Sequence, residues 1–159
     1  MNIEKNQLYM FSFLFSIILI YSYYYLLKGI GENRLKQMWG GIDGNVKNVY
    51  LISMLLCIAS MLLIFKKIYD SKLSNYNNYF IGMLLILLPS IMWTPLSLHY
   101  LNNKSNIIKF SILSVLLLVS IGSYLIHQED KNIGAKYFTF HVFFLDFIYW
   151  SYRFFSYNN

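Results

Sequence analysis

The chain has 159 residues, of which 57% are hydrophobic and 13% are charged. Soluble domains average about 25% charged residues, and here the charged residues are missing from several long runs of the sequence. Apolar runs of about 18 residues or more are typical of membrane-spanning helices. The composition therefore excludes an ordinary soluble domain and predicts an integral, multi-pass membrane protein, without indicating which membrane.

The basic and sulfur-containing residues exclude further classes of protein. The net charge is +6, but the longest basic run is the pair Lys66-Lys67, so nucleic-acid binding is not expected. The single cysteine, Cys57, lies inside an apolar run. It can form neither a disulfide framework nor a cysteine-based zinc site, and we interpret it as a packing residue.

Five apolar segments follow one another along the chain, each of 19 to 23 residues. At about 1.5 Å per residue, helices of this length match a hydrocarbon core of about 30 Å. The predicted spans cover residues 8–27, 49–68, 79–101, 107–127 and 137–155. The expected fold class is all-α, a polytopic bundle of five transmembrane helices in a single domain over residues 1–159. Lys and Arg divide six against seven between the two sides, so the orientation is left open.

The first apolar segment could also be interpreted as a secretory signal peptide. Its apolar run is longer than the core of about 7 to 15 residues that signal peptides carry, and no small-residue cleavage site follows it. We therefore expect residues 8–27 to be a retained first helix.

The segment between the first two spans contains a short amphipathic stretch. In "ENRLKQMW", Leu35, Met38 and Trp39 share one helical face, which suits a helix lying at the membrane surface. The stretch ends at Gly40-Gly41. Two interpretations stay open: a plain linker, or a lid over one mouth of the bundle.

The third span carries the unusual sequence "LLPSIMWTPLSLHY". Pro89 and Pro95 each remove a backbone hydrogen bond and favour a kink, with Trp93 between them. Kinks in membrane helices are tolerated where neighbouring helices or a cavity satisfy the freed carbonyl groups. The same helix should present a polar face, made of Ser90, Thr94 and Ser97.

Asp146 is the only acidic residue in any of the predicted spans. A charged side chain at a helix centre costs about 2.5–3.5 kcal/mol on insertion. Eight Phe, Leu, Ile and Val residues between positions 138 and 148 return about 2.4–4.8 kcal/mol. The two values nearly cancel, so we expect this helix to be held by its neighbours with Asp146 facing inward.

In an α-helix Asp146 belongs to one stripe, whose other members are Thr139, Val142, Tyr149, Trp150 and Arg153. His141, five residues earlier, falls outside this stripe. We expect the carboxyl to face Ser90, Thr94 and Ser97 of the third span. It could serve only in packing, through an interhelical hydrogen bond, or it could belong to a ligand site or proton pathway.

Catalytic and metal-binding chemistry finds little support in the sequence. There is no HExxH, GxSxG or Walker A motif, so we predict no catalytic residues and a protein that is not an enzyme. His127 and His141 flank the same loop and could meet, but a single pair is weak evidence for a metal. We predict no metal site, and leave any cofactor unknown.

The order of the spans and a few motifs resemble the tryptophan-rich sensory protein/translocator protein family. Trp93-Thr94-Pro95 matches the family's W-x-P in the third helix, "YYYLLKG" before the first loop is similar to its W-Y-x-x-L-x-K-P, and "LLLVS" in the fourth span is compatible with the family. The chain departs from the pattern at Gly29, where the family has proline. The resemblance implies that tetrapyrroles or sterol-like molecules bind inside the bundle, at Trp93, Pro95 and Trp39.

Binding or carrying a small apolar ligand inside the bundle is the function that we expect from these observations. The candidate ligand-binding residues are Trp93, Thr94, Pro95, Asp146, Trp150 and Trp39. The alternatives are a non-catalytic structural or assembly protein and a proton- or ion-coupled transport component. A preformed pocket lined by Trp93 and Trp150 would favour ligand binding. The expected partners are the lipid bilayer and the ligand, and self-association into a homo-oligomer is left open.

Overall fold

The computed structural model describes residues 3–70, 73 and 75–158, and all the regular structure in these residues is helical. The elements in chain order are α1 (Lys5–Leu27), α2 (Glu32–Met38), α3 (Gly44–Tyr69), α4 (Tyr76–Asn103), α5 (Asn106–Asp130), α6 (Ile133–Phe140), the π-helical segment η1 (His141–Trp150) and α7 (Ser151–Asn158). The all-α prediction is confirmed.

Four of the helices are long and apolar enough to cross a membrane: α1, α3, α4 and α5. They contain the first four predicted spans and extend each of them by a few residues, because polar residues cap their ends. The side chain of Asn75 accepts hydrogen bonds from two backbone N–H groups at the start of α4, and Ser105 caps α5 in the same way. α4 continues through Pro89 and Pro95.

The fifth predicted span, residues 137–155, is not a single long α-helix. It lies within a run that is helical from residue 133 to residue 158 but changes type twice, from α6 to η1 and from η1 to α7. The count of five α-helical spans is therefore not confirmed at this element. Over His141–Trp150 the backbone is wound as a π-helix, which is wider than an α-helix. Hydrogen bonds there join residues five apart: Ser151 N–H donates to the carbonyl of Asp146.

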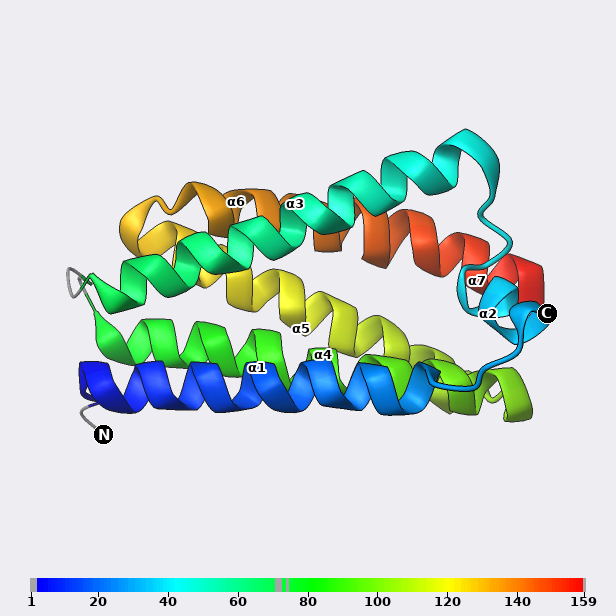
Figure 1. The fold of residues 1–159 in the computed structure, drawn as a ribbon, viewed down its shortest axis with the longest axis horizontal. Helices are drawn as coiled ribbons and strands as arrows, with labels where there is room; N and C mark the ends of the chain where they lie inside the picture. The colour runs from blue at the N-terminus through cyan, green and yellow to red at the C-terminus, as the bar shows by residue number, and fades with distance from the viewer. Residues whose placement is uncertain (1–2, 71–72, 74, 159) are drawn as a thin grey trace.

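The long elements pack side by side into a ring. α1 packs on α4, α4 on α5, α5 on α6 and η1, α6 and η1 on α3, and α3 on α1. The contact of α1 with α3 lies at one end, where the rings of Tyr9 and Tyr69 are 6.0 Å apart. From there the two helices diverge toward the end of the bundle that carries α2 (Figure 1). The bundle is thus closed on most sides and splayed on one.

α4 and α5 cross in close backbone contact at two glycines. A Cβ atom added to Gly122 would lie 2.6 Å from the carbonyl oxygen of Gly82, and one added to Gly82 would lie 2.9 Å from that of Gly122. The backbones can approach this closely only because neither residue has a side chain.

Candidate functional site

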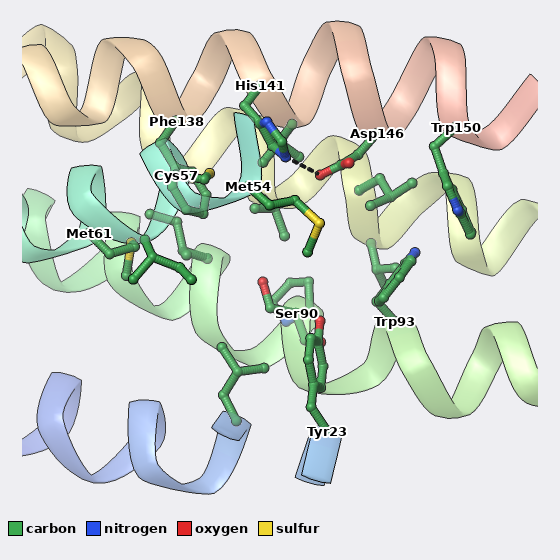
Figure 2. Close-up of a pocket in the computed structure, with 18 of the residues that line it drawn as sticks. Tyr23, Met54, Cys57, Met61, Ser90, Trp93, Phe138, His141, Asp146 and Trp150 are labelled. Carbon is green, nitrogen blue, oxygen red and sulfur yellow. Dashed lines mark hydrogen bonds and ion pairs between the residues drawn. The ribbon is translucent and has the colours of Figure 1, made fainter. Parts of the chain in front are cut away.

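The interior of the ring contains a cavity of about 380 Å³, which is drawn in Figure 2. This volume lies within the range of about 300–1,000 Å³ that is typical of small-molecule sites. Its walls come from the second half of α1, from α2, from the middle of α3, and from α4, α5, α6 and η1. Toward α2 these parts of α1 and α3 diverge (Figure 1), so the cavity reaches the splayed part of the ring.

The π-helical geometry of η1 brings His141 and Asp146 together. His141 Nε2 lies 3.6 Å from Asp146 Oδ2, and both side chains line the pocket. In an α-helix, residues five apart point in different directions, but a π-helix closes each turn on the fifth residue and places them on one side. The prediction that His141 lies away from Asp146 is therefore wrong, because it assumed α-helical periodicity.

Asp146 faces the interior, as expected, but its hydrogen-bond partner is on a different helix from the one predicted. Tyr50 Oη, from α3, donates to Asp146 Oδ1, whereas Ser90 lines the wall of the pocket across from the carboxyl (Figure 2). Thr94 and Ser97 are fully buried and do not line the pocket. The Asp146 side chain keeps 22% of its surface exposed, which leaves part of the carboxyl open to the cavity.

A chain of polar contacts continues from this pair along α3. His141 Nδ1 and Ser53 Oγ are 2.8 Å apart, and Ser53 Oγ is also 2.8 Å from Tyr137 Oη. His141 and Ser53 are both buried. Five side chains, three from the α6–η1 run and two from α3, thus form one connected group across this interface. We call Tyr50, Ser53, Tyr137, His141 and Asp146 the polar group.

All three tryptophans of the chain line the same pocket. The rings of Trp93 and Trp150 are 5.0 Å apart, and Trp39 contacts Tyr50 edge-on at 5.7 Å. Trp150 Nε1 donates to the carbonyl of Met38 at 3.0 Å. Trp93 Nε1 is buried and has no hydrogen-bond partner among the described residues, which leaves one donor available.

Helix α2 covers the end of the pocket that Trp150 approaches. Leu35, Met38 and Trp39, the face predicted for this segment, all contribute to the pocket wall. α7 holds the segment in place, because Asn158 Nδ2 donates to the carbonyl of Gln37 and Arg153 donates to that of Gly41. This position at the mouth of the pocket agrees with the lid interpretation.

The predicted site residues thus divide into two groups. Four of them, Trp39, Trp93, Asp146 and Trp150, line one pocket, whereas Pro95 is exposed and lies outside it, as does Thr94. Sequence reasoning missed Tyr50, Ser53 and His141 as members of the site. The spacing of Tyr50, Ser53 and Cys57 along α3 (i, i+3, i+7) was an available signal, since it places polar and small side chains on one face.

The histidines do not assemble a metal site in the described part of the chain, where no group of three or more metal-ligating side chains is found. His127 Nδ1 lies 3.0 Å from the carbonyl oxygen of Asn132, and His99 contacts Asn103. His141 contacts Ser53 and Asp146. Each histidine therefore has its own local partners, and no contact joins His127 to His141 among those described.

Compared with models of known protein families, with curated proteins and with solved structures, the chain gives no significant match. The site is therefore interpreted from its own geometry: a mostly apolar cavity, an aromatic wall, the short helix α2 at one end, and one carboxyl group whose neighbours are a phenol and an imidazole.

Proposed function

We propose that this protein crosses the bilayer five times and binds a small, largely apolar molecule in the pocket at the centre of the ring. The observation that carries the proposal is the preformed cavity of about 380 Å³, lined by all three tryptophans. Small-molecule sites are typically concave and mostly apolar, with a few polar groups that fix the orientation of the ligand. Here those groups are Asp146, His141 and the free indole N–H of Trp93.

The fifth crossing is assigned to the run of residues 133–158. It packs along α5 and α3, and α7 ends at the opposite end of the bundle from the start of α1 (Figure 1). Five crossings require the two ends of the chain to lie on opposite sides of the membrane. In a Cys57→Ser background, Glu4→Cys and Tyr157→Cys should be labelled from opposite sides by a membrane-impermeant thiol reagent. Labelling from the same side would contradict five crossings.

The splayed contact of α1 and α3 offers the ligand a path from the bilayer. The outer faces of these helices carry large exposed apolar side chains, including Ile20, Leu55 and Leu62, as expected for surfaces in contact with lipid. An apolar molecule dissolved in the bilayer could enter between the diverging halves without crossing water. The resemblance to the translocator protein family likewise implies an apolar ligand inside the bundle.

The neutral fluorophore N-phenyl-1-naphthylamine tests pocket binding, because tryptophan can transfer excitation energy to it. With the protein in lipid nanodiscs, we expect saturable transfer from the tryptophans. Val119→Phe should reduce this transfer strongly, since Val119 is buried in the pocket wall. The matched control is Val49→Phe, on the exposed outer face of α3, which should leave the transfer unchanged. Equal energy transfer in both variants would show that the probe does not bind in the pocket, and would favour the structural or assembly alternative.

Proton-coupled transport is a second candidate, because the polar group places five side chains with exchangeable protons in sequence from Tyr50 to Tyr137, with its longest step, 3.6 Å, between Asp146 and His141. In liposomes with a pH-sensitive dye inside, this candidate predicts a proton leak that is abolished by Asp146→Asn. If the leak is absent from the natural chain, ligand binding without proton coupling is favoured.

A further inference from the structure

The pocket has two chemically different ends. Asp146 lies toward the end that carries Trp93 and Trp150, whereas Met61 and Phe138 lie at the other end (Figure 2). The thioether and the phenyl ring are apolar and offer at most a weak hydrogen-bond acceptor. A molecule that fills both ends therefore needs an apolar body and one polar head group.

The carboxyl of Asp146 has no permanently charged partner within the described residues. Its Oδ1 accepts from Tyr50, and its Oδ2 lies 3.6 Å from His141 Nε2. No Lys or Arg nitrogen of the described chain lies within 4.0 Å of it, and Arg153 on the same helical run is bonded to a backbone carbonyl instead. Each carboxylate oxygen can accept about two hydrogen bonds, so Oδ2 retains capacity toward the cavity.

The rings around this end of the pocket also favour a positive charge. Trp39, Tyr50, Trp93 and Trp150 all line the pocket, and the faces of such rings attract cations within about 6 Å, those of tryptophan most strongly. Trp39 already has the ammonium of Lys47 over its ring, 5.8 Å from the centroid. The same electrostatics disfavours an anion, as does the carboxyl. A neutral head group would gain a hydrogen bond to Oδ2 but no charge interaction.

We propose that the ligand is a lipophilic amine. Its protonated nitrogen donates to Asp146 Oδ2, beside the aromatic wall of the pocket, and its apolar body extends toward Met61 and Phe138. This inference rests on the proposed function and narrows it, because it excludes ligands whose head group at this position is a carboxylate.

Three probes with one hydrocarbon body and different head groups test the inference: 1-adamantanemethylamine, 1-adamantanemethanol and 1-adamantanecarboxylate. The readout is the rate at which N-ethylmaleimide modifies Cys57 in nanodiscs, because Cys57 is the single cysteine of the chain and lines the pocket. Probe concentrations are corrected for partition into empty nanodiscs. We expect the amine to protect Cys57 at concentrations at least tenfold lower than the alcohol, and the carboxylate to protect least.

One variant identifies the group responsible. Asp146→Asn keeps the acceptor for Tyr50 but cannot carry a charge, and it should bring the amine and the alcohol to within twofold of each other. The matched control is Asp70→Asn at the exposed end of α3, where we expect no change.

The outcomes separate this inference from the proposed function. If the amine and the alcohol protect Cys57 equally in the natural chain, the amine proposal is overturned while pocket binding stands. A preference for the amine that persists unchanged in Asp146→Asn would also overturn it. If none of the three probes protects Cys57, the amine proposal fails. The proposed function fails with it only if N-phenyl-1-naphthylamine also shows no energy transfer from the tryptophans.

Discussion

The α4–α5 contact and the α3–η1 contact hold the same ring together by different means. At the first, Gly82 and Gly122 let two backbones meet, and the buried side chains around them are mainly apolar. At the second, the polar group joins side chains across the interface. The cavity lies against the polar contact, whose members Tyr50, His141 and Asp146 line it.

The difference indicates a division of roles between the two contacts. Between membrane helices, close backbone packing supplies dispersion energy without exposing polar groups, so the α4–α5 contact is suited to fixing the frame. Polar side chains in a membrane are costly unless they are paired. Their presence beside the cavity, and not at the glycine crossing of α4 and α5, favours a role in binding. Each prediction below changes one side of this comparison.

The largest loss of stability is expected from Gly122→Ala. Helix propensity alone would make alanine more stable by about 1 kcal/mol, but the new Cβ would lie 2.6 Å from the Gly82 carbonyl and force α4 and α5 apart. Overpacking of this kind costs about 1–3 kcal/mol, so the net loss of stability should reach about 2 kcal/mol. Unfolding in mixed micelles, followed by circular dichroism, measures it.

Ser114→Ala is the control, because Ser114 lies on the exposed face of α5 and gains helix propensity without a clash. Equal stability of the two alanine variants would show that the glycine crossing does not hold the frame.

A smaller loss of stability is expected from Ser53→Ala, which changes the polar group. This change removes the contacts of the Ser53 hydroxyl with His141 and Tyr137, and hydrogen bonds between membrane helices contribute about 0.6–1.7 kcal/mol. Ser60→Ala is the matched control: Ser60 is buried on the same face of α3, but its hydroxyl donates only to the carbonyl of Leu56 in its own helix. Chemical unfolding of both variants should separate them, and equal losses would contradict an interhelical role for Ser53.

We expect Trp150→Phe to lower the local stability of α2, the segment interpreted as a lid. The variant loses the hydrogen bond to the Met38 carbonyl, which is worth about 0.5–1.5 kcal/mol, mainly as local stability of α2. Amide hydrogen exchange over residues 32–42 should therefore become faster. Trp93→Phe makes the same chemical change at an indole whose N–H has no partner among the described residues. If it accelerates exchange equally, the lid is not held by the Trp150 hydrogen bond.

Several features of the fold could be predicted from the sequence because they depend on composition and local pattern. Long apolar runs predict α1, α3, α4 and α5, and the i, i+3, i+4 spacing of Leu35, Met38 and Trp39 predicts the face of α2 that reaches the pocket. The insertion cost of a carboxyl predicts that Asp146 faces inward. None of these inferences needs knowledge of which helices are neighbours.

The partners of Asp146 could not be predicted in the same way. The pairing with His141 depends on the π-helical backbone of η1, and no residue pattern in "HVFFLDFIYW" indicates a π-helix. The pairing with Tyr50 depends on α3 lying beside η1 in the ring, which periodicity does not specify. The sequence therefore indicated a buried acid but not the helix that supplies its hydrogen-bond partner.

The smallest effect is expected in the coupling between Tyr50 and Asp146. Asp146→Ala alone should cost about 0.6–1.7 kcal/mol, and Tyr50→Phe somewhat less, because its ring keeps its contacts with Trp39 and His141. In a double-mutant cycle the two losses should fall short of additivity by about 0.6 kcal/mol, the average for membrane hydrogen bonds. Tyr23→Phe provides the matched cycle, since Tyr23 also lines the pocket but donates to the Ser90 carbonyl. That cycle should be additive within about 0.3–0.5 kcal/mol. Additivity in both cycles would mean that the Tyr50–Asp146 hydrogen bond contributes nothing to the α3–η1 contact, which would leave the carboxyl with a role toward the cavity alone.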